Sequence, residues 1–252
     1  MRGHSAQPLV ILFAKAPVAG RVKTRLLPVL TAQQAAKLHA ALVADMLRML
    51  GEMKSLVELE LHTDAATEAW PEFAGPRRLQ RAGGLGEKLL AAIDEGLARG
   101  YRSVLVLGSD SPGLPCSHVE ELLCGETDVK LGPAEDGGYY GILARRTVAG
   151  MLDGVRWSTE HTMADTVASV ERGGLSVSLG NSWFDVDEPG NLRRMRRVVE
   201  PGSATARWLG DADVQLRLAD RLVWTAAEEE RGEGPKDFGA GADAAHEGTT
   251  DL

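Results

Sequence analysis

Short aliphatic segments alternate with amphipathic ones over the first 200 residues, and this alternation constrains the fold more than any other feature. Strands are predicted at 8–14, 57–62, 104–107, 129–131, 139–143 and 175–179. Helices are predicted at 31–50, 85–99, 117–123, 159–172 and 187–199, with capping boxes at Thr31/Gln34 and Ser117/Glu120. The pattern predicts an α/β protein whose mostly parallel sheet is covered by helices on both faces.

The chain has 252 residues, 44% of them hydrophobic, and a net charge of −8. This acidic balance argues against nucleic acid or an anionic membrane as the main partner, but permits a small phosphate-bearing ligand. Cys116 and Cys124 match no zinc or redox motif, and the histidines are scattered. Without a signal peptide or a bilayer-spanning apolar run, we expect a soluble, cytoplasmic protein.

The chain divides into three parts. Residues 1–200 carry the alternating pattern and form one predicted domain. Residues 201–225 are a C-terminal extension of uncertain structure, in which 208–224 reads equally as strand or helix. Residues 226–252 are acidic, rich in Gly and Ala and poor in large apolar side chains, so we predict that this tail is disordered.

Asp110 follows the predicted strand 104–107 in the sequence Gly-Ser-Asp-Ser-Pro-Gly. Ligands of open α/β sheets bind at the carboxyl ends of strands, where a carboxylate suits a hard divalent cation. Ser109 is a candidate substrate contact there. The alternative is that Asp110 only forms an Asx-turn or caps the next helix.

The loop after the first strand concentrates positive charge in an otherwise acidic chain. Gly20 permits close backbone approach, and the cations are Lys15, Arg21, Lys23 and Arg25. Arg grips phosphate through paired hydrogen bonds and Lys acts as a point charge. The spacing is not that of a Walker A loop. We predict a nucleotide- or phosphate-binding loop, with a solvated basic loop as the alternative.

Two further segments carry paired carboxylates. Glu135 and Asp136 precede a Gly-Gly pair and a strand, and are candidates for a catalytic base. The candidate substrate contacts beside them are Gly137, Gly138 and Tyr139, although Gly-Gly alone explains a hairpin turn.

Asp185 and Asp187 have strand spacing, which places both on one face. One could join Asp110 around Mg²⁺ or Mn²⁺, or Asp187 could cap the following helix. Trp157 and Ser158 precede a helix, where an anion or plain capping is expected.

Taken together, these motifs resemble one family. Residues 13–26, Gly108–Pro115, Gly132–Tyr140, Trp157–Thr159 and Asp185–Asp187 are similar to DUF2064 proteins, also described as radical-SAM/selenodomain-associated transferase 1 or arsenosugar-biosynthesis glycosyltransferase-like. The resemblance spans about residues 8–200. It implies a GT-A fold, the Rossmann-type three-layer α/β/α architecture of nucleotide-diphospho-sugar transferases.

The resemblance also implies roles. Asp110 is similar to the metal-binding Asp of that fold, Asp187 to its late second ligand, and Lys15–Arg25 to its nucleotide loop. The family usually has Gly-Asp-Leu-Gly-Glu-Arg where this chain reads Gly83-Gly84-Leu85-Gly86-Glu87-Lys88. The missing Asp at Gly84 implies altered substrate choice or lost activity.

Three functions follow. The first is a metal-dependent glycosyltransferase with a nucleotide-sugar donor and a small-molecule acceptor, in which Asp136, then Glu135, is the acceptor base. The second is a nucleotidyltransferase that moves NMP from an NTP to a phosphorylated or carboxylated small molecule and releases pyrophosphate. The third, motivated only by Gly84, is a non-catalytic nucleotide-binding partner protein.

Overall fold

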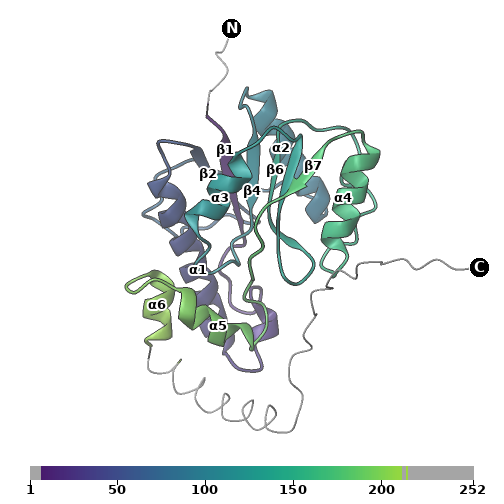
Figure 1. Cartoon of the computed structure of the whole chain (residues 1–252). Helices are drawn as coiled ribbons and strands as arrows, with labels where there is room; N and C mark the ends of the chain where they lie inside the picture. The colour runs from purple at the N-terminus through teal and green to yellow at the C-terminus, as the bar shows by residue number, and fades with distance from the viewer. Residues whose placement is uncertain (1–6, 212–213, 215–252) are drawn as a thin grey trace, which may run out of the picture.

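A computed structural model describes residues 7–211 and 214 and contains one seven-stranded sheet in the order β3-β2-β1-β4-β6-β5-β7 (Figure 1). The strands are β1 (Leu9–Ala14), β2 (Glu58–Thr63), β3 (Arg77–Leu79), β4 (Val104–Leu107), β5 (Val129–Pro133), β6 (Tyr139–Ala144) and β7 (Val177–Leu179). Strand β6 runs antiparallel to β4 and β5, and the other pairs are parallel. The predicted α/β class with a mostly parallel sheet is confirmed.

Helices cover both faces of this sheet (Figure 1). They are α1 (Ala32–Glu52), α2 (Leu85–Ala98), α3 (Cys116–Leu123), α4 (Thr162–Arg172), α5 (Asn191–Val198) and α6 (Ala204–Leu209), with a short 3-10 helix η1 (Thr24–Leu26). Every residue of β1 is buried because successive side chains enter opposite layers. Val10 and Leu12 pack toward α1 and α3, whereas Leu9 and Ile11 pack toward α2 and α4. The result is the three-layer architecture that the sequence resemblance implies.

Local signals predicted the elements unevenly. The capping box of Thr31 and Gln34 is present at the start of α1. The capping box predicted for Ser117 and Glu120 is wrong, because α3 begins one residue earlier and Pro115 is its N-cap. Helices α4 and α5 begin three to four residues later than predicted starts at 159 and 187, and the edge strand β3 was not predicted.

Within the described residues beyond residue 200, helix α6 packs on α1. Trp208 and Leu209 join a cluster with Leu38 and Leu42, and the Trp208 indole donates to the Gln34 carbonyl over 3.1 Å. Residues 208–209 belong to α6, so the part of the segment 208–224 that the structure assigns here is helix and not strand. Residues 215–225 and the predicted disordered tail at 226–252 lie outside the described residues.

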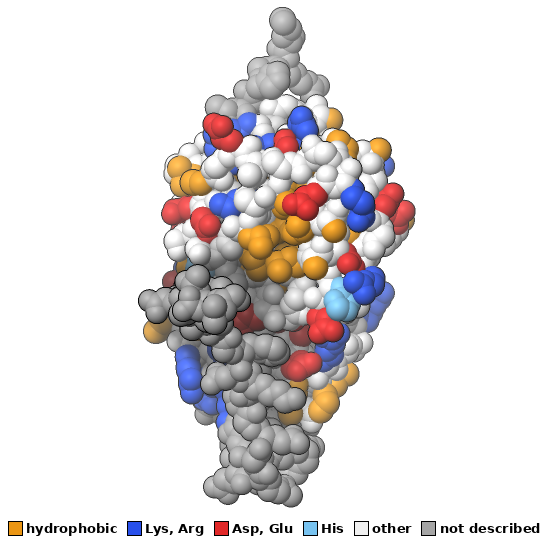
Figure 2. Space-filling model, turned by 45° about the vertical axis from the view of Figure 1, so that its right-hand side comes forward, with side chains coloured by type: hydrophobic (Ala, Val, Ile, Leu, Met, Phe, Trp, Pro, Cys, Tyr) orange, Lys and Arg blue, Asp and Glu red, His pale blue; other side chains and the backbone are white. Residues whose placement is uncertain are grey.

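The surface shown in Figure 2 has acidic and basic side chains interspersed, not gathered into one basic face such as nucleic-acid-binding proteins present. Among the helices of the described residues, none is both long and apolar enough to cross a membrane.

Candidate active site

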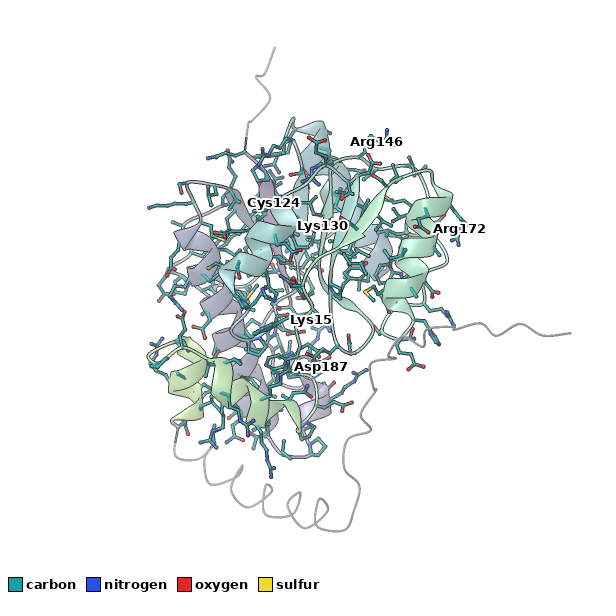
Figure 3. The ribbon with its side chains drawn as sticks, viewed as in Figure 1. Lys15, Cys124, Lys130, Arg146, Arg172 and Asp187 are labelled. Atoms are coloured by element: carbon teal, nitrogen blue, oxygen red, sulfur yellow. The ribbon has the colours of Figure 1, made fainter. Side chains whose placement is uncertain are left out.

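Eight of the predicted site residues line one cavity of about 600 Å³, at the carboxyl ends of β1 and β4. This volume lies within the range of about 300–1,000 Å³ that small-molecule sites occupy. Figure 3 shows Lys15 and Asp187 at this same end of the sheet. The predicted residues that line the cavity are Lys15, Arg21, Lys23, Arg25, Ser109, Asp110, Ser158 and Asp187.

The basic loop after β1 is anchored by the neighbouring strand. The amide of Ala16 donates to Asp64 Oδ1 over 2.7 Å at the end of β2. Gly20 has a φ of +79°, a conformation that favours glycine, and it lies outside the cavity lining. Lys15 and Arg21 are exposed, and within the described residues neither forms an ion pair. These two cations are therefore available to an anionic ligand.

Lys23 differs from the other cations of the loop because its side chain is only 2% exposed. Its Nζ lies 2.7 Å from Asp110 Oδ1 and 3.0 Å from Asp187 Oδ1. Burial opposes the charge of Lys23, but the two carboxylates outweigh this effect and raise its pKa. Burial likewise disfavours the Asp110 carboxylate, yet Lys23 and His39 outweigh it and lower the pKa of Asp110. The three side chains form one ionic cluster at the cavity wall.

Asp110 and Asp187 meet because their two segments run side by side. The amide of Val186 donates to the carbonyl of Asp110 over 3.0 Å. Phe184 and Val186 are buried while Asp185 and Asp187 are half-exposed, so the two carboxylates share a face although the segment is no strand. Burial and then the charges of Asp187 and Asp136 raise the pKa of Asp185 to about 6. Asp187 is not a helix cap, since Gly190 precedes α5.

His39, from α1, is a member of the site that sequence reasoning missed. Its Nε2 lies 2.9 Å from the carbonyl oxygen of Lys15, and a carbonyl only accepts, so Nε2 carries a proton. Its Nδ1 faces Asp110 Oδ1 at 3.7 Å. His39 Nδ1 and Asp110 Oδ1 are both buried without a hydrogen-bond partner in the described part of the chain. No local motif could reveal this residue, because the packing of α1 alone brings it to the cavity.

Glu135 and Asp136 lie outside the cavity lining. Arg194 binds both oxygens of Glu135, and this contact lowers the pKa of the carboxyl. Asp136 Oδ1 accepts a hydrogen bond from the Gly138 amide over 2.9 Å within the turn, and Asp136 forms no ion pair among the described residues. Of the two predicted bases, Asp136 is the one whose charge is not already neutralised.

The remaining candidates of that segment have structural contacts. Gly137 has a φ of +86°, and a Cβ there would lie 2.2 Å from the Glu160 carbonyl oxygen. Tyr139 packs at 6.3 Å between ring centroids against Trp157, and its buried hydroxyl has no hydrogen-bond partner in the described residues. Neither Tyr139 nor Trp157 lines the cavity. Gly137 lets its turn approach the loop that contains Glu160. The rings of Tyr139 and Trp157 pack against each other and not against the cavity.

The N-terminus of α2 forms another wall of the cavity. A Cβ at Gly86 would lie 2.9 Å from the Trp157 ring, so glycine lets the 157–159 loop approach α2. Ser158, in this loop, lines the cavity with a positive φ of 59°, a costly conformation for a serine. Lys88 of α2 also lines the cavity. Non-glycine residues with a positive φ are found more often at functional sites than elsewhere.

Asp110 and Asp187 fit a divalent cation by their chemistry. Their Oδ1 atoms converge on one ammonium, yet their side chains remain 45% and 38% exposed. Because Asp110 Oδ1 itself is buried, the exposure of Asp110 comes from the rest of its side chain, which includes Oδ2. The described residues contain no group of three Asp, Glu, His or Cys that could hold a metal alone. Mg²⁺ needs no such group, because it binds through one or two carboxylates plus phosphates and water.

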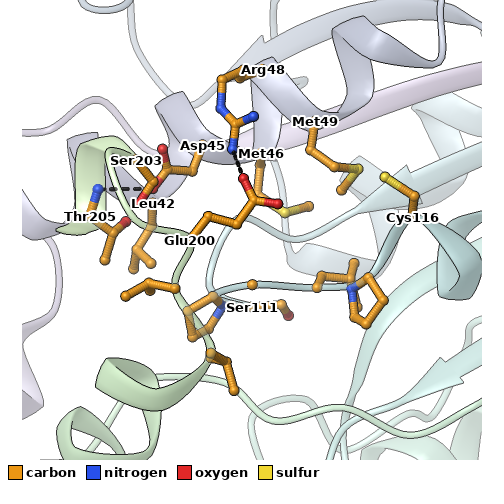
Figure 4. Close-up of a pocket in the computed structure, with 16 residues that line it drawn as sticks. Leu42, Asp45, Met46, Arg48, Met49, Ser111, Cys116, Glu200, Ser203 and Thr205 are labelled. Atoms are coloured by element: carbon orange, nitrogen blue, oxygen red, sulfur yellow. Dashed lines mark hydrogen bonds and ion pairs between the residues drawn. The ribbon is translucent and has the colours of Figure 1, made fainter.

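A second cavity, of about 230 Å³, lies between α1, the loop 111–116 and residues 198–205 (Figure 4). None of the predicted site residues lines it. Its charged groups are already paired, since Arg48 bonds Glu200 over 2.6 Å and Asp45 accepts from the Ala204 and Thr205 amides. We therefore place the site at the larger cavity.

The fold, with its cavity at the carboxyl ends of β1 and β4, is of the nucleotide-diphospho-sugar transferase-like α/β class, to which the first similar structure described below also points. The sequence model of the family described as "Uncharacterized protein conserved in bacteria (DUF2064)" matches residues 34–159, and the chain belongs to that family. No protein of curated function matches the chain significantly.

Several solved structures are similar to this chain, among them the following two. A protein from Desulfovibrio desulfuricans G20, provisionally assigned as a nucleotide-diphospho-sugar transferase, is 29% identical with a TM-score of 0.73, covering 86% of this chain and 98% of that one. The inositol-1-phosphate CTP transferase from T. maritima is 12% identical with a TM-score of 0.52, covering 80% and 99%. The second likeness concerns the fold alone.

Proposed function

We propose that this protein is a divalent-metal-dependent glycosyltransferase that uses a nucleotide-sugar donor and a small-molecule acceptor. The observation that carries the proposal is the single cavity in which unpaired cations of the first-strand loop face the convergent carboxylates Asp110 and Asp187. The transferase fold of the similar structures supports it.

Each group has a role that follows from its place. Lys15, Arg21 and Lys88 attract the phosphates. Asp110 and Asp187 would hold Mg²⁺ or Mn²⁺, which would supply positive charge for the departing diphosphate. Asp136 lies outside the cavity lining, but near enough to Asp185 for its charge to raise the pKa of that carboxyl. It takes the proton of the acceptor hydroxyl or thiol, because Glu135 is held by Arg194.

Nucleotidyl transfer is the second candidate, and the number of cations favours it. Lys15, Arg21, Arg25 and Lys88 all line the cavity, which suits a triphosphate as well as a diphosphate. The fold likeness to a CTP transferase is compatible with this chemistry.

One incubation separates the candidates. The protein is mixed with Mg²⁺, a panel of NTPs and nucleotide-sugars, and a panel of alcohols, thiols and phosphorylated acids. Release of a nucleoside diphosphate supports glycosyl transfer, and release of pyrophosphate supports nucleotidyl transfer. Tight nucleotide binding without either product would favour the non-catalytic partner protein. Absence of nucleotide binding, measured by calorimetry, would contradict all three.

A further inference from the structure

Lys23 has contacts that do not suit a phosphate-binding lysine. An ammonium has three donors and no acceptor. Nζ lies 3.0 Å from Asp187 Oδ1 in a hydrogen bond and 2.7 Å from Asp110 Oδ1 in an ion pair. The ammonium is therefore within contact distance of two carboxylates, and the side chain is 2% exposed. Little of Lys23 remains for a ligand.

The exposure of the three side chains shows their order from the interior outward. Lys23 is buried, whereas Asp110 and Asp187 are 45% and 38% exposed. The ammonium thus lies beneath the carboxylates and contacts one oxygen of each. The second oxygen of Asp187, Oδ2, lies 3.9 Å from the exposed guanidinium of Arg25. The carboxylates, rather than Lys23, are therefore the groups that can be reached from the cavity.

The backbone of Lys23 supports a role for its side chain. Its φ of 49° and ψ of 40° place it in the left-handed region, which favours glycine or asparagine. A lysine in this conformation costs free energy that its contacts must offset. The ion pairs with Asp110 and Asp187 are the contacts that the structure provides.

We propose that Lys23 is a positioning residue that holds Asp110 and Asp187 together from beneath and partly neutralises them, and that it does not itself bind phosphate. Without it, two adjacent carboxylates would repel each other and any polyphosphate in the cavity. This inference rests on the proposed function for the identity of the ligand class, and the contact itself does not depend on it.

Arg21 provides a matched control. It belongs to the same loop and lines the same cavity, but it is exposed and forms no ion pair within the described residues. Lys23→Met and Arg21→Met each remove one positive charge and keep an unbranched apolar stem. Each variant is made with Asp187 intact and with Asp187→Asn, which gives two double-mutant cycles.

The first readout is the urea midpoint of unfolding without ligand. We expect Lys23→Met to lower the midpoint more with Asp187 intact than in the Asp187→Asn background, and Arg21→Met to act equally in both. The second readout is the affinity for inorganic pyrophosphate in EDTA, measured by calorimetry. Lys23→Met is expected to weaken it at least about tenfold with Asp187 intact and less than about threefold with Asp187→Asn, since the repulsion is then reduced.

If Lys23 instead binds phosphate directly, the loss of pyrophosphate affinity differs between the two backgrounds in the opposite direction. Asp187→Asn would release such a lysine to the ligand, so Lys23→Met would then cost as much affinity, or more, in that background. That result, or an unfolding cycle without coupling, would overturn the proposal. If not even the unaltered protein binds pyrophosphate in EDTA, the unfolding cycle alone decides whether Lys23 holds the carboxylates, and the proposed function, which requires a metal, is tested separately by the incubation with Mg²⁺.

Discussion

The buried ionic cluster around Glu60 predicts a defined loss of stability. Glu60, in the middle of β2, is 2% exposed, and its carboxylate contacts Arg99, Arg78 and His62. Burial raises the pKa of Glu60, but hydrogen bonds to His62 and Arg99 outweigh it and lower that pKa from 4.5 to about 2. The side chain is thus held in its charged form.

The magnitude follows from this shift. Each pKa unit corresponds to about 1.4 kcal/mol, so a shift of about 2.5 units contributes about 3 kcal/mol to the free energy of unfolding at pH 7. Because the folded pKa lies below the unfolded one, this contribution is complete above about pH 4.5 and disappears as the pH falls toward 2.

The test is urea unfolding of Glu60→Gln at about pH 7 and at about pH 3. We expect a loss of about 3 kcal/mol at pH 7 that shrinks markedly at pH 3. Glu171→Gln is the control, because Glu171 is exposed on α4 and forms no ion pair within the described residues; we expect it to change stability by less than about 0.5 kcal/mol. A loss below about 1 kcal/mol at pH 7, or an equal loss at both pH values, would refute the reasoning.

Two glycine substitutions test the loop contact at Gly137 and the N-terminus of α2 at Gly84. Gly137→Ala places a Cβ 2.2 Å from the Glu160 carbonyl oxygen, so it should lower the melting temperature more than Gly125→Ala, whose φ of +84° is similar but whose Cβ meets nothing within 4 Å. Equal losses in the two variants would show that the loops adjust freely. Gly84→Asp restores the residue usual in the family, and its Cβ would lie 3.7 Å from Glu87 Oε2, an ordinary contact. We expect its unfolding free energy to stay within about 0.5 kcal/mol, since Asp is a favoured N-cap; a loss above about 1 kcal/mol would contradict this.

The sequence predicted the parts of the site that depend on strand ends. Asp110 and Asp187 are far apart in the chain. The position of Asp110 after a strand, the two-residue spacing of Asp185 and Asp187, and the family resemblance together predicted that Asp187 could join Asp110. The basic loop was predicted for the same reason, because it follows β1. These are inferences from topology, which a mostly parallel sheet makes reliable.

Features that depend on packing were not predictable. His39 reaches Asp110 only through the position of α1. The burial of Lys23 follows from tertiary contacts, whereas the sequence of the basic loop suggested an exposed, mobile cation. Strand β3, with the sequence Arg-Arg-Leu, has no apolar pattern and exists through its pairing with β2. Arg194, which neutralises Glu135, comes from a helix with no sequence signal linking it to that segment.

The most direct test of the account is the binding of Mn²⁺ and pyrophosphate to Asp110→Ala. Free Mn²⁺ is measured by electron paramagnetic resonance, with and without pyrophosphate, for the unaltered protein and the variant. We expect the unaltered protein to bind the two ligands cooperatively and Asp110→Ala to lose this metal-dependent binding. An unchanged dependence on Mn²⁺ in a folded Asp110→Ala variant would contradict the assignment of the carboxylates as the metal site.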